Sequence, residues 1–307
     1  MKKRLLAFSA FIALTSGVSL AQQDKLITHF IFDKMSINPG STGISDGICG
    51  TMIYRNQWDK VNGAPNSALF NAEANLDRYN IGGVGLSFYH DAIAFSRQNN
   101  LQLNYSYHLF VQNVGTFGIG AGVGILNLGM DPKWVPPTSS ADPLLPLATS
   151  GTNLDVNAGI YFRGMGQKFY AGLSATHLSE SEIEVLKYTP ARHYYAMTGY
   201  RFPNLFGETH DLDVQALLRT DLVQYSADIN VRYIWDNRFY GGLTYRTSDA
   251  VAGMIGVHFG PWTFGYSYDF TVNKLSTVSR GSHELMAKYC YYLPPIPVHK
   301  YKHPRWL

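Results

Sequence analysis

Apolar and polar residues alternate along most of this chain with a period of two. The alternation is cleanest between residues 101 and 109. One set there is apolar, namely Leu101, Leu103, Tyr105, Tyr107 and Leu109, and the intervening set is polar, namely Gln102, Asn104, Ser106 and His108. Because successive side chains of a strand point to opposite faces, this segment is a strand with one apolar face and one polar face.

The same pattern predicts fourteen strands. They cover residues 45–58, 67–79, 81–91, 98–111, 116–129, 152–163, 167–178, 193–202, 210–219, 224–236, 238–248, 251–260, 261–272 and 282–293. In the clearest of them the apolar face is continuous, whereas the opposite face carries charges such as Asp155, Asp228 and Arg232. A soluble barrel with a filled, dry core has the reverse arrangement. We therefore predict an all-β fold, a transmembrane outer-membrane β-barrel of about 14 antiparallel strands.

The lengths of the connections support this prediction. Connections after even-numbered strands are mostly tight, as at residues 113–115 and 236–237, and those after odd-numbered strands tend to be longer, as at residues 130–151. Outer-membrane barrels alternate short periplasmic turns with long external loops in this way. Two connections fit less well, because residues 203–209 are long for a turn and the link near Thr220 is short for a loop.

The ends of the chain predict the domain organisation. Residues 1–21 combine a basic start, an apolar run and small residues before Gln22, which is typical of a cleaved secretory signal peptide. Residues 22–44 form an N-terminal segment, periplasmic or plug-like. Its apolar cluster Phe30, Ile31 and Phe32 favours packing at or in the lumen of the barrel. Residues 45–293 make the barrel, and residues 294–307 form a proline-rich, basic periplasmic tail.

Charge and composition give no support for nucleic-acid binding and favour membrane strands. Three of the 25 Lys and Arg residues lie in the signal peptide and none of the 22 Asp and Glu residues do, so the mature chain carries 22 of each sign. This balance gives no electrostatic basis for nucleic-acid binding. Aromatic residues make up 14% of the chain and no apolar run long enough for a spanning helix follows residue 21. That composition suits membrane strands with aromatic girdles.

Three motifs could suggest chemistry, and none of them predicts an enzyme, a cofactor or a metal site. The glycines at positions 118, 120, 122 and 124 recur inside a strand and not at a strand-to-helix turn, so they do not form a dinucleotide loop. We expect them to leave a lumenal face bare, with room for another segment to pack. Ser282, His283 and Glu284 alternate faces on one strand and cannot form a triad. His299 and His303 have helical spacing, but Pro297 and Pro304 argue against a helix.

Two cysteines occupy the first and last predicted strands, which are neighbours if the barrel closes. Cys49 and Cys290 are both expected on the lumenal face near the periplasmic end. A barrel-closing disulfide is one interpretation, and the oxidising periplasm permits it. Two free thiols on adjacent strands is the other.

Several blocks together resemble the PorP/SprF family of Bacteroidetes. They are Asn38 and Pro39, the run Tyr54, Arg55, Asn56, Gln57 and Trp58, then Gly63, Ala64 and Pro65, the run 83–86, the run 266–269, and Ser282, His283 and Glu284. The likeness covers nearly the whole mature chain. It implies a fourteen-stranded barrel of the fatty-acid-transporter type in the type IX secretion and gliding apparatus. Members usually read Asn-Pro-Ala-Tyr-Ala-Gly where this chain has Gly40, Ser41 and Thr42 after the Asn-Pro pair, so no role of that tyrosine carries over.

The resemblance implies partners and leaves alternatives open. One implied role is a component of the secretion machine, linked to a periplasmic ring of PorK and PorN and to a PorE-like peptidoglycan-binding protein. The other is a SprF-like partner for one large secreted adhesin. Uptake of small hydrophobic solutes is a third possibility, of a different class. The basic tail, with His299, Lys300, Lys302, His303 and Arg305, is either a handle for periplasmic partners or a disordered end.

Overall fold

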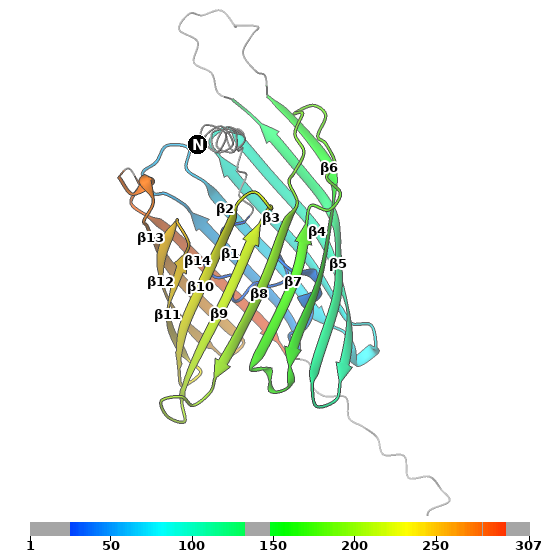
Figure 1. Cartoon of the computed structure of the whole chain (residues 1–307), viewed down its shortest axis with the longest axis vertical. Coiled ribbons are helices and arrows are strands. Elements are labelled where there is room, and N and C mark those ends of the chain that lie inside the picture. The colour runs from blue at the N-terminus through cyan, green and yellow to red at the C-terminus, as the bar shows by residue number, and fades with distance from the viewer. Residues whose placement is uncertain (1–24, 133–147, 278, 293–307) are drawn as a thin grey trace, which may run out of the picture.

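The computed structural model describes residues 25–132, 148–277 and 279–292. Within them, fourteen antiparallel strands form one closed barrel in which each strand pairs with its neighbours in sequence and β1 pairs with β14 (Figure 1). This confirms the predicted fold class and strand number. Figure 1 shows the barrel upright, with the tight connections at its lower end. We call this the short-turn end and the opposite one the long-loop end.

The strands have the following bounds: β1 Ile48–Asn56, β2 Asn66–Asn75, β3 Gly83–Ile93, β4 Ser96–Val111, β5 Gly115–Met130, β6 Thr149–Gly164, β7 Phe169–Thr176, β8 His193–Phe202, β9 His210–Thr220, β10 Tyr225–Trp235, β11 Phe239–Arg246, β12 Ala250–Phe259, β13 Trp262–Thr271 and β14 Ser282–Tyr291. Short 3-10 turns add η1 Pro39–Ser41, η2 Asp77–Tyr79, η3 Met165–Gln167 and η4 Lys274–Thr277.

Several predicted strands are longer than the observed ones, among them the seventh, which is Phe169–Thr176 and not 167–178. The first and second are shortened for local reasons. The second ends at Asn75 because η2 follows, closed by Asn80 in the left-handed conformation (φ 58°). The first begins only at Ile48 because the residues before it belong to a segment inside the barrel. It ends at Asn56, and Trp58 adopts a positive φ of 54° in the loop beyond. Tertiary packing sets these boundaries, which alternation alone does not reveal.

The outer wall is apolar and the inner wall is polar, as the alternation predicts. On β4, Leu103 is 67% exposed on the outside, whereas Ser106 is fully buried on the inside. Hydrocarbon solvates such an outer face without cost, while the lumen accommodates the polar residues. No helix among the described residues is long and apolar enough to cross a membrane.

Residues 25–47, which we call the lumenal segment, fill the barrel (Figure 1, blue). Thr28, His29, Asn38 and Thr42 of this segment are completely buried. The hydrophobic core lies here, where side chains of the segment pack on inward side chains of the wall. It comprises Phe30, Ile31, Ile37, Ile44, Tyr161, Tyr195, Met197, Leu217, Ile234, Tyr240 and Met254. This confirms the predicted packing of the N-terminal segment in the lumen.

Glycines of β5 provide the surface on which η1 lies. A Cβ on Gly118 would come within 2.1 Å of the Gly40 carbonyl oxygen, and one on Gly120 within 2.3 Å of the Pro39 oxygen. Real Cβ atoms do not approach oxygen so closely, so any side chain there would displace the lumenal segment. The bare face expected from the sequence is therefore confirmed at Gly118 and Gly120, where backbone of the lumenal segment covers it, whereas at Gly122 the nearest group is the Asn104 side chain.

β1 and β14 close the barrel with a continuous register from Ile48 opposite Tyr291 to Asn56 opposite His283. Cys49 lies directly opposite Cys290, with 4.1 Å between their Cα atoms, and a disulfide joins them. The bond spans 241 residues of sequence. It lies toward the short-turn end of the seam.

Candidate functional site in the barrel lumen

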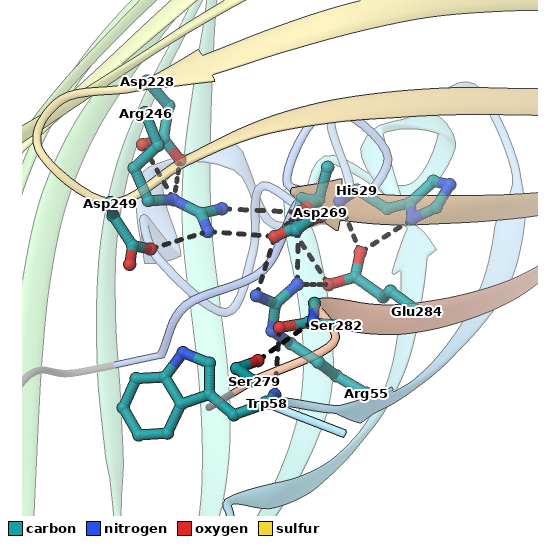
Figure 2. Close-up of polar contacts among 12 residues, drawn as sticks. His29, Arg55, Trp58, Asp228, Arg246, Asp249, Asp269, Ser279, Ser282 and Glu284 are labelled. Carbon is teal, nitrogen blue, oxygen red and sulfur yellow. Dashed lines mark hydrogen bonds and ion pairs between the residues drawn. The ribbon is translucent and has the colours of Figure 1, made fainter. Parts of the chain in front are cut away.

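A buried charge network fastens the start of the lumenal segment to the closing seam. Arg55 of β1 donates from Nη2 to Asp269 of β13 (2.8 Å) and from Nη1 to Glu284 of β14 (3.1 Å). Arg55 and Glu284 occupy opposite positions in the strand register, so closure of the barrel brings them together. From the lumenal segment, Thr28 contacts both carboxylates and His29 contacts Glu284. Figure 2 shows His29 beside Glu284. The network therefore joins three strands and the lumenal segment.

The lumenal segment donates hydrogen bonds to both carboxylates of the network and accepts one from Arg55. The backbone N–H groups of Thr28 and His29 donate to the two oxygens of Glu284, at 2.9 and 2.7 Å. The Thr28 hydroxyl donates to Asp269 at 3.0 Å and accepts from Arg55 at 3.2 Å. A carboxylate that receives two backbone N–H groups and a guanidinium is strongly held. The segment is thus fixed at this level by its backbone as well as its side chains.

Arg246 of β11 extends the network away from the seam. It donates from Nη1 to Asp269 (3.2 Å) and from Nε to Asp228 of β10 (3.2 Å). Arg219 of β9 also contacts Asp228 and donates to the Lys25 carbonyl oxygen at 3.0 Å. Three buried arginines thus face three buried carboxylates. Burying charges is tolerable only with such pairing.

Asn38 clamps the other end of the lumenal segment. Its side-chain oxygen accepts from the Gly40 N–H at 2.8 Å, and its amide donates to the carbonyl oxygens of Ile160 (3.0 Å) and Leu173 (3.3 Å). Pro39 follows at the first position of η1, where its missing N–H costs nothing. The Asn-Pro pair therefore shapes the turn and attaches it to β6 and β7.

Two cavities lie between the lumenal segment and the wall at the short-turn end. Their volumes are about 600 and 260 Å³, and both are lined by Ile31, Phe32, Lys34, Gln167 and Tyr170. Lys34 stands at their junction. Its ammonium lies 3.6 Å from the centre of the Tyr170 ring and donates to the Tyr161 hydroxyl at 3.3 Å.

Burial shifts the pKa of two side chains of the lumenal segment, Asp33 and Lys34. Burial lowers the pKa of Lys34 to about 7, and the positive charges of Lys288 and Arg232 act in the same direction. Burial also raises the pKa of Asp33 above its usual value, although the hydrogen bond from Ser36 opposes the rise. No group of three His, Cys, Asp or Glu side chains in the described parts of the chain is arranged to hold a metal ion.

Comparison with protein families assigns the chain. Residues 19–289 match the model of the type IX secretion system membrane protein PorP/SprF. The chain belongs to the PorP/SprF family. It is therefore a membrane protein of the type IX secretion system with an outer-membrane barrel fold. A search of curated proteins returns no significant match.

Solved structures similar to this PorP/SprF protein are outer-membrane barrels. The CymD monoaromatic hydrocarbon channel matches with a TM-score of 0.50 at 10% identity, over 84% of this chain and 92% of CymD. The toluene transporter TbuX of Ralstonia pickettii gives 0.49 at 10% identity, over 85% and 93%. Omp33 of Acinetobacter baumannii gives 0.45 at 8% identity, over 81% and 100%. At these identities the likeness concerns the fold alone.

The family-motif residues of β1 and β14 meet at the seam of this PorP/SprF barrel, but they do not share one face. Arg55 and Glu284 point into the lumen and are 2% and 0% exposed, whereas Tyr54 is 47% exposed on the outer wall. Asn56 lies opposite His283 in the register. Only the inward members of the motif belong to the charge network.

The rest of the first motif forms the loop after β1. The Gln57 N–H donates to the Pro65 oxygen at 2.9 Å, and the Gly63 oxygen accepts from the N–H of Ala94 at 2.9 Å. The Trp58 N–H donates to the Ser282 hydroxyl at 3.1 Å, while the indole points away from the charge network (Figure 2). These contacts tie the first loop to the loop after β3 and to the start of β14.

The sequence did not indicate the lumenal partners of Arg55 and Glu284. Thr28 and His29 carry no motif and lie in a segment without regular structure, so no pattern indicates which wall residues they meet. Arg246 was not singled out, although alternation places Asp228 on the inward face and Asp269 belongs to a quoted family block. The predicted partner handle, His299, Lys300, Lys302, His303 and Arg305, lies outside the described residues.

Proposed function

We propose that this PorP/SprF protein is a non-enzymatic outer-membrane component of the type IX secretion system that works by binding other proteins of the machine. The supporting observation is the lumenal segment, which occupies the barrel from the Arg55 network to η1. A secreted protein cannot pass through a lumen that is filled in this way. The barrel therefore serves as a membrane anchor for the machine and not as its conduit.

The proposed partners are the periplasmic ring of PorK and PorN and a PorE-like, cell-wall-linking protein. Family membership supports a place in this system. We propose that the basic tail, with Lys300, Lys302 and Arg305, is the handle for them. Three cations within six residues of sequence would attract an acidic partner surface and speed its association.

Affinity purification tests this role. The full-length protein with Lys300→Ala, Lys302→Ala and Arg305→Ala is compared with the unmodified protein and with a control that carries Lys60→Ala and Arg238→Ala at the barrel ends. We expect the unmodified protein and the control to co-purify ring and cell-wall-linking proteins, and the tail variant to lose most of them. Equal recovery of the partner proteins with all three forms would show that the tail is not part of the interface.

Deletion of the gene separates the remaining roles. Loss of many secreted proteins supports the machine component, whereas loss of a single large adhesin supports the SprF-like role. Unchanged secretion with impaired uptake of an aromatic hydrocarbon would favour a transporter; CymD is named a monoaromatic hydrocarbon channel and TbuX a toluene transporter. The filled lumen leads us to expect the first outcome. It also predicts negligible conductance for the purified protein in planar bilayers.

A further inference from the structure

The two lumenal cavities at the short-turn end hold more positive than negative charge. Lys34 lines both of them, Arg232 lines the larger and Lys288 lines the smaller. Phe32 lies next to two of these cations and close in sequence to the third. Its ring lies 4.7 Å from the Arg232 guanidinium, and its carbonyl oxygen accepts a hydrogen bond from Lys288 at 3.1 Å. Lys34 follows two residues later in the chain. Arg232 and Lys288 therefore both lie beside Phe32, and Lys34 lines the cavity next to each of them.

The hydrogen-bond partners of Lys34, Lys288 and Arg232 do not neutralise their positive charge. Within the described residues, the ammonium groups of Lys34 and Lys288 donate to neutral oxygens, those of the Tyr161 hydroxyl and the Phe32 backbone. Arg232 contacts Asp213, but Asp213 also pairs with Arg201 at 2.7 Å. The Nε and Nη1 atoms of Arg232 are buried without a hydrogen-bond acceptor.

The other carboxylates of the cavity wall are already engaged. Asp46 accepts from Arg163 at 3.0 Å and from the Gln167 side chain at 2.8 Å. Glu73 accepts from the Gly43 N–H at 2.8 Å. The cavity consequently has an unbalanced positive potential, which its low-dielectric walls focus.

The walls are also suited to an apolar group. Ile31, Phe32 and Tyr170 line both cavities, and Tyr200 lines the larger. The larger cavity reaches the turn around η3, where Gly166, Gln167 and the exposed Lys168 border it. A molecule that enters from the short-turn end meets a cationic rim first and the aromatic surface afterwards.

We propose that the larger cavity binds an amphipathic organic anion, with its carboxylate or phosphate group between Lys34 and Arg232 and its apolar body on Phe32 and Tyr170. A volume of about 600 Å³ holds a small organic acid or one end of a longer molecule. This site goes beyond the proposed function and does not rest on it. Binding is measured on the purified barrel and is independent of any secretion partner.

Calorimetric titration of the full-length protein in detergent micelles, below pH 7 so that Lys34 is protonated, tests the site. The probes are N-acetylphenylalanine for a carboxylate source and phenyl phosphate for a phosphate source, with N-acetylphenylalaninamide as the uncharged match. We expect at least one anion to bind, and the amide to bind roughly tenfold more weakly, because it lacks the charge-assisted hydrogen bonds. The anion that binds with the higher affinity shows whether the site prefers a carboxylate or a phosphate group. Equal binding of acid and amide, or no binding of either anion, overturns the proposal.

Inorganic phosphate tests the contribution of the apolar body. We expect it to bind more weakly than phenyl phosphate, since it cannot use the surface of Phe32 and Tyr170. Equal affinity would show a site for bare anions and contradict the amphipathic ligand.

Substitutions locate the site. Arg232→Gln and Lys34→Met should each weaken binding of the tighter anion roughly tenfold, whereas Arg238→Gln, an arginine 72% exposed on a short turn, should leave it unchanged. Slower migration of unheated protein in gels reveals any variant that fails to fold. If the cavity variants fail to fold, Lys168→Gln at the exposed rim tests the site instead. We expect it to lower the affinity for the anion two- to threefold, and this difference should disappear at high salt. Unchanged affinity in the folded cavity variants refutes the assignment.

Discussion

At the residue scale, Arg55 is the side chain on which the lumenal site most depends. It joins Asp269, Glu284 and Thr28 at distances of 2.8, 3.1 and 3.2 Å and is 2% exposed. Arg55→Met removes the guanidinium from Asp269 and Glu284 and leaves Glu284 with the His29 imidazole and the backbone N–H groups of Thr28 and His29 as its partners. We expect the free energy of unfolding in micelles to fall by about 3–5 kcal/mol. Urea titration followed by tryptophan fluorescence measures the loss.

Two further variants separate charge imbalance from general damage. Arg55→Met combined with Glu284→Leu removes a cation and an anion together, and Asp269 keeps Arg246 at 3.2 Å. We expect this double variant to be more stable than Arg55→Met alone, because no carboxylate is stranded. Arg238→Met, on a turn, should change stability by less than about 0.5 kcal/mol. A double variant that is as unstable as the single one would exclude the imbalance as the cause.

Lys34 gives a prediction of pH dependence. Its pKa is lowered to about 7 by burial and by the charges of Lys288 and Arg232, against weaker opposite effects of Asp213 and Glu73. Between pH 7 and the usual lysine pKa of about 10.4, the unfolded chain binds the extra proton. The free energy of unfolding should therefore rise with pH across this window. NMR titration of ¹³C-dimethylated protein measures the Lys34 pKa on which this depends. A Lys34 signal that titrates at the usual lysine pKa of about 10.4 would contradict the prediction.

At the scale of elements, β5 shows how a strand is adapted to the segment it carries. Gly120→Ala would place a Cβ 2.3 Å from the Pro39 oxygen, whereas Gly129→Ala on the same strand meets its nearest atom, Ser150 Cβ, at 3.6 Å. We expect the first substitution to displace η1 and to expose Lys34 to trypsin, so that cleavage after Lys34 becomes at least several times faster. The second should leave the cleavage rate unchanged. Equal protection in both variants would mean that η1 does not need the bare surface.

The strands could be predicted from the sequence much better than the site could. Each strand alternates visibly because hydrocarbon lies on one side of it and polar groups on the other, so the count of fourteen follows from local pattern. The same alternation indicates which residues, such as Asp228, point inward. It does not indicate which inward residues meet. The pairing of Arg55 with Thr28 depends on the path of an irregular segment, and that path follows from close backbone contacts such as Gly40 on Gly118.

At the scale of the whole molecule, closure of the barrel and packing of its lumen depend on each other. The lumenal segment precedes β1 in the chain and lies inside a wall that only the pairing of β1 with β14 completes. The Arg55 network binds the segment to the inside of this seam near one end, and the disulfide between Cys49 and Cys290 covers the other end. Loss of either fastening should therefore weaken the seam and the lumenal packing together.

The disulfide provides the test of this coupling. Its 241-residue separation corresponds to about 5.5 kcal/mol in the chain-entropy account of cross-links. We expect Cys49→Ala with Cys290→Ala to lower the urea midpoint and also to speed trypsin cleavage after Lys34, because a seam that opens more often exposes the segment inside. Iodoacetamide labelling of the unmodified, denatured protein should find no free thiol before reduction and two after it. Two labelled thiols before reduction would show that the bond does not form. A lower midpoint with unchanged cleavage would show that the seam and the lumenal segment are independent.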